Sequence, residues 1–182
     1  AEIAGKVTKA GLKLTGVIGA AFGCPFEGDV DPSQVASLIK RLMDGGATEI
    51  VLADTIGAAV PTQITDMLNR ARDVQGDDFG LGLHLHNTRN TGFANAAAAA
   101  LAGVDFLDAS VGGIGGCPFA PRATGNIATE DLCYMLRNMG FDTGVDLSKM
   151  IGVSEWTEKY FEGPLPGQIM KAGLFPEAAA RA

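Results

Sequence analysis

The feature that most restricts the fold of this chain is a fourfold alternation of short apolar segments with longer helix-like ones. The strand-like segments are residues 12–21, 49–53, 81–90 and 105–110. Helical periodicity follows each of them, at residues 32–44, 61–74, 92–103 and 129–140. An interval of roughly 30 residues is the size of one strand with its crossover helix. The pattern therefore predicts an α/β domain built on a parallel sheet.

Polar residues gather where these strands are predicted to end. Asp54, Thr55, His84, His86 and Asp108 all follow apolar stretches, as functional residues do at the carboxyl face of a (β/α)8 barrel. Four units make only half of such a barrel, which uses ~250 residues. We therefore predict a partial TIM barrel over residues 1–162 and a Pro/Gly-rich arm over residues 163–182. A doubly wound open sheet is the alternative, although no GxGxxG follows the first strand.

The two histidines of the chain both fall in one predicted strand, LGLHLHNTRN, at positions 84 and 86. Side chains alternate faces along a strand, so His84 and His86 point the same way with Cα atoms roughly 6.6 Å apart. That spacing allows both imidazoles to bind one cation. The alternative is a pair of histidines whose rings are satisfied by backbone carbonyls.

A glycine-rich run, VGGIGGCPFAPRATGN, occupies residues 111–126 and ends in Asn126. Dense glycine allows a backbone to pass close to a ligand and a loop to open and close, although a plain tight turn also explains it. Two imidazoles and an amide oxygen favour Mg or Mn over a closed zinc site. A structural zinc site that uses Cys24 and Cys117 is a weaker alternative, because the spacings fit no zinc-finger pattern.

Composition excludes several classes of partner. A formal charge of −7 with a pI near 4.7 argues against nucleic acid, and no run of ~18 apolar residues predicts a membrane span. The three cysteines have no CxxC spacing, which is typical of reduced thiols rather than a disulfide framework. The first residues lack the features of a signal peptide. We expect a cytoplasmic protein, or alternatively one of the mitochondrial matrix, that binds a small molecule.

Five segments of the sequence resemble a known enzyme family. They are FGCPFEGDV, LADTIG, HLHNTRN, GGIGGCPFAPRATGNIATEDL and LPGQIMKAG. Together they closely resemble hydroxymethylglutaryl-CoA lyases, which belong to the metal-dependent lyase and Claisen-condensing superfamily built on TIM barrels. The resemblance covers about Gly11 to Gly173 and implies the second half of that barrel with additional C-terminal helices.

The resemblance also implies a role for individual residues. His84, His86 and Asn126 would bind the divalent cation, and Cys117 would be a catalytic thiol on the glycine loop. Substrate-binding roles fall to Asp54, Thr55 and Gly116. Supporting roles around the metal fall to Glu130 and Asn87, the latter at a position where some relatives carry aspartate.

The implied reaction cleaves 3-hydroxy-3-methylglutaryl-CoA to acetyl-CoA and acetoacetate, a step of leucine degradation and ketone body formation. A cation that holds the tertiary hydroxyl lowers the pKa of that hydroxyl, and His84 is our candidate for relaying its proton. Cys117 is our candidate for protonating the acetyl-CoA enolate, because a free thiol with a pKa near 8.5 is mostly protonated at neutral pH.

Three hypotheses about the function remain open from the sequence. The first is the lyase, with little activity for this chain alone, because the ligand aspartate and catalytic arginine of the superfamily belong to an earlier strand. The second is an enzyme of the same superfamily that condenses acetyl-CoA with a 2-keto acid. The third is a non-catalytic half barrel that acts as a binding module. A half barrel exposes strand edges, so we expect a homo-oligomer or association with the missing N-terminal half.

Overall fold

The computed structural model describes residues 2–116 and 124–175 of the chain. Four parallel strands form one sheet in the order β1-β2-β3-β4. Their bounds are Thr15–Ile18 (β1), Glu49–Asp54 (β2), Gly80–Leu85 (β3) and Phe106–Asp108 (β4). The predicted α/β class with a parallel sheet is confirmed.

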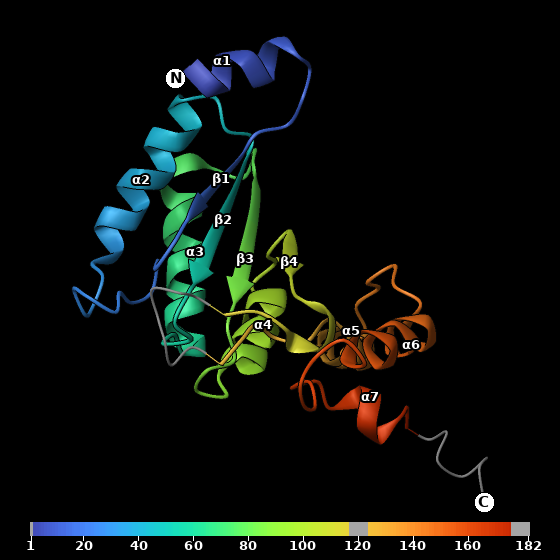
Figure 1. Ribbon diagram of the computed structural model, residues 1–182. Coiled ribbons are helices and arrows are strands. Elements are labelled where there is room, and N and C mark those ends of the chain that lie inside the picture. Colours follow the sequence, from blue (N-terminus) through green and yellow to red (C-terminus); the bar gives the residue numbers. More distant parts are fainter. Residues whose placement is uncertain (1, 117–123, 176–182) are drawn as a thin grey trace, which may run out of the picture.

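Helices connect the strands and continue beyond β4. They are α1 (Glu2–Lys9), α2 (Pro32–Asp44), α3 (Pro61–Gln75), α4 (Gly92–Leu101), η1 (Val111–Gly113), α5 (Thr129–Asn138), α6 (Leu147–Glu158) and α7 (Ile169–Ala172). Figure 1 shows α2 and α3 along one side of β1–β3, with α5, α6 and α7 beyond β4. The N-terminal end of α2 is capped as its sequence predicts, because the Asp31 side chain accepts a hydrogen bond from Ser33 N at 2.8 Å.

Three strands are shorter than the segments that predicted them, namely the first, the third and the last. β3 ends at Leu85 and not at Asn90, so His86 lies just beyond the strand. β1 ends at Ile18, and the chain then turns through Ala20, whose φ is +53°. β4 ends at Asp108, and two residues later Ser110 pairs with Ala128 instead of continuing beside β3. The first and last segments both leave the sheet at its carboxyl edge, where the chain turns into loops.

The core lies between the sheet and its covering helices. Alternate residues of the strands, including Ile18, Leu52 and Leu83, are buried in one cluster with side chains of α2 and α3 such as Ile39 and Leu68. Burying one such side chain contributes roughly 1.5–3 kcal/mol. This packing holds the carboxyl ends of the strands at a common level.

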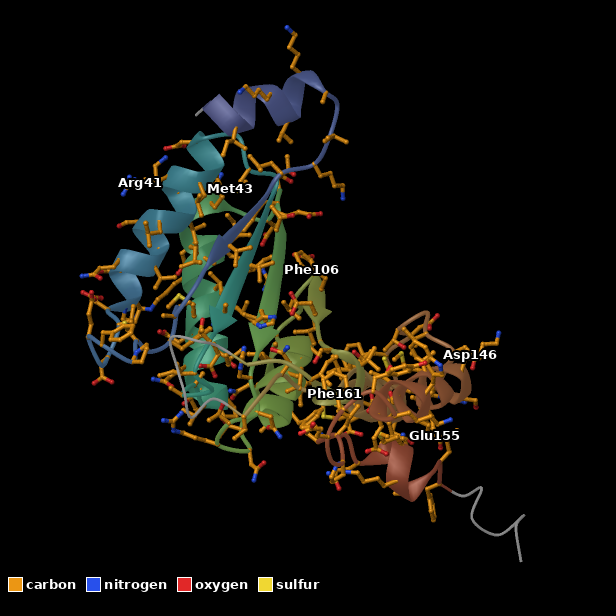
Figure 2. All side chains as sticks on the ribbon, viewed as in Figure 1. Arg41, Met43, Phe106, Asp146, Glu155 and Phe161 are labelled. Carbon is orange, nitrogen blue, oxygen red and sulfur yellow. The ribbon has the colours of Figure 1, made fainter. Side chains whose placement is uncertain are left out.

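The opposite face of the sheet carries a different set of residues. Val17 on this face is 63% exposed, whereas His84 and Asp108 lie on it as register partners of β3 and β4. The Phe106 ring contacts β3 at Gly82, a position where any Cβ would overlap the ring (Figure 2). Glycine at position 82 therefore makes room for the aromatic ring on the sheet.

The segment after α6 packs against the domain. Leu165 and Met170 are buried, and Asp131 of α5 accepts hydrogen bonds from the backbone N–H groups of Gln168 and Ile169. The first part of the predicted C-terminal arm, up to α7, thus docks on α5. In the described residues no helix is long and apolar enough to cross a membrane.

Gly82→Ala should lower the free energy of unfolding by about 1–3 kcal/mol, because the new methyl group overlaps the Phe106 ring. Urea denaturation measures this change. Adding Phe106→Ala removes the overlap, so the double variant should lose less stability than the two single changes combined.

Gly5→Ala on α1 is the matched control, because nothing lies within 4 Å of its new Cβ. Alanine is the better helix former, so this variant should keep the stability of the parent or gain up to ~1 kcal/mol. A Gly82→Ala protein as stable as the parent would contradict the packing described for Phe106.

Candidate metal centre and active site

The two imidazoles meet at the carboxyl end of β3. His84 Nε2 and His86 Nε2 lie 3.2 Å apart, with ring centroids separated by 5.1 Å and ring planes at 69°. His84 is the last residue of β3 on the face away from the helices, and His86 follows Leu85 on the same face. The alternation of side chains along a strand predicted this shared face. The structure adds that the Nε2 atoms of the two rings are close enough to bind one ion.

Asp108 is in contact with the other nitrogen of His84. The Asp108 Oδ1 atom lies 2.5 Å from His84 Nδ1. The contact follows from the sheet, because His84 and Asp108 are register partners in β3 and β4. The sequence predicts that Asp108 lies at a strand end but not that it contacts His84, because the register that joins the two residues cannot be read from the sequence.

Asn126 reaches the same place through a returning segment of chain. Ile127 N donates to Leu85 O at 3.1 Å, and Asn87 N donates to Gly125 O at 3.0 Å. These bonds continue the end of β3 and set Asn126 opposite His86 as an antiparallel bridge partner. Residues 81–90 and 125–128, well separated in the sequence, thereby form one edge of the site.

The amide of Asn126 is oriented by its own hydrogen bond. Its Nδ2 group donates to Ile114 O at 3.0 Å, whereas its Oδ1 atom is buried without a hydrogen-bond partner among residues 2–116 and 124–175. Gly115, with φ of +133°, permits this arrangement, because a Cβ there would overlap Asn126 Nδ2. Buried oxygens are normally satisfied, so Asn126 Oδ1 is an acceptor that a ligand can use.

The two imidazoles have opposite pKa shifts. The hydrogen bond to Asp108 raises the pKa of His84, and burial opposes it, while the Asp108 charge and the Asn126 side chain add smaller increases. Burial lowers the pKa of His86, and the neighbouring His84 lowers it further. His86 is therefore held neutral more readily, which is the form that binds a metal.

These atoms fit a divalent cation. Two ligands at right angles on a cation with bonds of ~2.1 Å lie about 3.0 Å apart, close to the 3.2 Å between the two Nε2 atoms. The unsatisfied Asn126 Oδ1 supplies an oxygen of the kind that Mg and Mn accept. In the described part of the chain no three His, Cys, Asp or Glu side chains gather as a metal group.

Asp54 and Thr55, predicted to bind substrate, are placed beside this edge by β2. Asp54 is 1% exposed, and its two oxygens accept hydrogen bonds from Ala58 N at 2.8 Å and Ala59 N at 3.0 Å. Burial raises the pKa of Asp54, although both hydrogen bonds act against that rise. Thr55 Oγ1 accepts from Ala20 N at 2.9 Å. Both side chains fix the loops that leave the strands.

Asn87 and Glu130, predicted as supporting residues, hold neighbouring turns. Asn87 Oδ1 accepts from Gly92 N at 3.2 Å at the beginning of α4. Glu130 is fully buried on α5, and its Oε2 atom accepts from Gly112 N at 3.0 Å, in η1 at the beginning of the glycine-rich run. Gly116 is exposed at the start of that loop. Cys117, the predicted thiol acid, lies outside the described residues.

Of the two cysteines in the alternative structural zinc site, Cys24 and Cys117, the structure describes Cys24. Cys24 is a half-buried free thiol, and its backbone pairs with Gly28 in the loop after β1. Cys133 is a buried free thiol on α5, and burial raises the pKa of its thiol. Cys117 lies outside the described residues, so the expectation of three reduced cysteines stays a prediction.

Comparisons with known proteins agree with this arrangement. Residues 1–156 match the family described as HMGL-like. The chain is 49% identical over 177 residues to the (R)-citramalyl-CoA lyase of Chloroflexus aurantiacus, which covers 97% of this chain and 56% of that protein. It is 40% identical over 163 residues to hydroxymethylglutaryl-CoA lyase YngG of Bacillus subtilis, covering 90% of this chain and 54% of that protein.

A solved structure extends the match to three dimensions. An HMG-CoA lyase from Acinetobacter baumannii, in complex with coenzyme A and 3-methylmalate, superposes with a TM-score of 0.89 at 37% identity, over 97% of this chain and 57% of that chain. The fold and the sequence relatives therefore define an α/β chain with the architecture of half of a TIM barrel, as predicted, and the relatives named above are CoA lyases. More narrowly, the chain belongs to the HMGL-like family.

The chain spans about half the length of the curated relatives it matches. The resemblance seen in the sequence is thus confirmed for the family and for the partial coverage. The roles of the individual site residues remain predictions that the geometry makes testable.

His86→Ala and Asn126→Ala should each weaken Mn²⁺ binding by at least about tenfold, because each removes one of the three donor atoms. Titration followed by Mn²⁺ electron paramagnetic resonance measures the free ion directly. Asn69→Ala on the exposed surface of α3 is the control for loss of an amide and should bind as the parent does. Unchanged affinity in both site variants would show that this site does not hold the cation.

Proposed function

We propose that this chain is the cation-binding part of a carbon–carbon lyase. The substrate of that lyase would be a 3-hydroxy-3-methyl acyl-CoA, in which it breaks a carbon–carbon bond. The observation that carries the proposal is the convergence of His84 Nε2, His86 Nε2 and the unsatisfied Asn126 oxygen at the carboxyl end of β3, in a chain of the HMGL-like family. The first candidate substrate is 3-hydroxy-3-methylglutaryl-CoA, which yields acetyl-CoA and acetoacetate.

The reaction breaks the bond between the tertiary carbinol carbon and the carbon next to the thioester. The hydroxyl proton leaves as the carbinol becomes a ketone, and the electron pair of the broken bond becomes the enolate of acetyl-CoA. A proton must then reach that enolate carbon. A bound Mg or Mn would polarise the hydroxyl and hold it in place.

The described residues support the first proton transfer. The Nδ1 atom of His84 is bonded to Asp108, so Nε2 is the only ring atom that can receive a proton. The ring would take the hydroxyl proton on Nε2 while that atom is not bound to the cation, and the carboxylate would stabilise the resulting charge. We assign the relay of the hydroxyl proton to His84. The assignment of Cys117 as the donor to the enolate carbon stays a prediction from the sequence.

A second substrate has its own support. The relative that is 49% identical over 97% of this chain is an (R)-citramalyl-CoA lyase. Citramalyl-CoA carries the same tertiary hydroxyl and methyl group but a carboxylate arm shorter by one methylene, and its cleavage gives acetyl-CoA and pyruvate. A pocket discriminates one methylene by only about 10–200-fold, so the preferred thioester should be processed in that excess over the other.

We also propose that the other half of the barrel covers the exposed face of the sheet. Val17 on that face is largely exposed, although alternate residues on the other face are buried. The relatives add to this support, because this chain spans only about half of their length. The residues that complete the site would come from that half, so this chain alone is expected to have little activity.

The test joins this chain to the preceding half of the Chloroflexus lyase, since the two proteins are 49% identical in the shared region. The fusion should release acetyl-CoA from at least one of the two thioesters in the presence of Mg²⁺. His86→Ala in the fusion should abolish release, and Asn69→Ala should leave it unchanged.

Other outcomes separate the competing functions. Net formation of a carbon–carbon bond between acetyl-CoA and a 2-keto acid, without cleavage, would favour the condensing enzyme. A folded fusion that binds Mn²⁺ but neither cleaves nor forms thioesters would contradict the proposed reaction and favour a binding module.

A further inference from the structure

The Asp108 carboxylate contacts one of the two imidazoles, that of His84. The two nitrogens of His84 have different partners, because Nδ1 lies 2.5 Å from Asp108 Oδ1, whereas Nε2 lies 3.2 Å from His86 Nε2. The Asn126 side chain also interacts with the His84 ring, but an amide oxygen holds a hydrogen less strongly than an ionised carboxylate does. The Asp108 side chain is 51% exposed and comes from the neighbouring strand rather than from β3 itself. The contact is therefore a feature of the sheet register.

The chemistry of the two partners determines where the hydrogen of a neutral His84 ring lies. An ionised carboxylate only accepts hydrogen bonds, so the nitrogen that faces Asp108 must carry the hydrogen. The other nitrogen, Nε2, then has its lone pair directed toward His86. Without the carboxylate, nothing described at Nδ1 would keep the hydrogen on that side of the ring.

We propose that Asp108 is a positioning residue that holds His84 in the Nδ1–H tautomer and keeps its Nε2 lone pair directed into the cation site. Metal-binding histidines generally donate their second N–H to a carboxylate or carbonyl, which fixes the ring and raises its affinity. The tautomer follows from the geometry alone, whereas its use in lyase chemistry rests on the proposed function.

The arrangement is asymmetric between the two histidines. His86 Nδ1 is buried and has no hydrogen-bond partner among the residues that the structure describes. The described residues thus fix the ring of His84 through a side chain but give His86 no comparable partner. Loss of Asp108 should alter His84 and leave the tautomer of His86 largely unchanged.

The first experiment is long-range ¹⁵N NMR of the imidazoles in the metal-free chain, at a pH where the same spectra show His84 to be neutral. The parent should show His84 with hydrogen on Nδ1. Asp108→Ala should move a large share of that hydrogen to Nε2. Asp108→Asn keeps an accepting oxygen and should give an intermediate result.

The second experiment measures Mn²⁺ affinity of the same proteins by electron paramagnetic resonance. Asp108→Ala should bind Mn²⁺ about 10–100-fold more weakly, and Asp108→Asn should recover part of the loss. Asp73→Asn on α3 removes the same charge from an exposed helix and should bind as the parent does. Amide correlation spectra identify the variants that remain folded, and the asparagine variant carries the test where the alanine variant does not fold.

The outcomes distinguish this proposal from the proposed function. A parent His84 with hydrogen on Nε2, or an Asp108→Ala protein with an unchanged tautomer and Mn²⁺ affinity within twofold of the parent, overturns the positioning role. A changed tautomer and weaker Mn²⁺ binding, in a fusion that cleaves no thioester, would leave the positioning role intact and count against the lyase alone.

Discussion

The hydrogen-bonded edge formed by the end of β3 is the interaction on which the site depends. Leu85 accepts a hydrogen bond from Ile127, and Ile127 in turn accepts one from Ser110 just beyond β4. The returning segment is thus held between the ends of two neighbouring strands. This places Asn126 opposite His86, while the β3–β4 register places Asp108 opposite His84. One short stretch of backbone pairing therefore sets the positions of four side chains.

Much of the fold could be predicted from the sequence because its local patterns agree with one another. Asp31 before Pro32 marked the beginning of α2, and the apolar segment at residues 49–53 predicted β2 almost to the residue. The lengths of β1 and β4 could not be predicted, because apolar residues continue past the points where the chain leaves the sheet. The burial of Leu165 against Gly112 could not be predicted either, because its segment is rich in proline and glycine and has no apolar periodicity.

The candidate site also has features that could be predicted from the sequence and features that could not. The shared face of His84 and His86 follows from the alternation of a strand, which is a local property. The contact between Asp108 and His84 depends on which residues of two strands are paired, and the sequence does not state that register. The two hydrogen bonds that Asp54 accepts from the following loop were not predicted either, because a polar residue after a strand is compatible with both a ligand contact and a loop anchor.

The central claim is that the ends of β3 and of the returning segment form one cation site. Anomalous X-ray diffraction from crystals of this chain grown with Mn²⁺ tests it most directly. The account predicts an anomalous peak within bonding distance of His84 Nε2, His86 Nε2 and Asn126 Oδ1. Mn²⁺ bound elsewhere, with these three atoms turned away from one another, would contradict it.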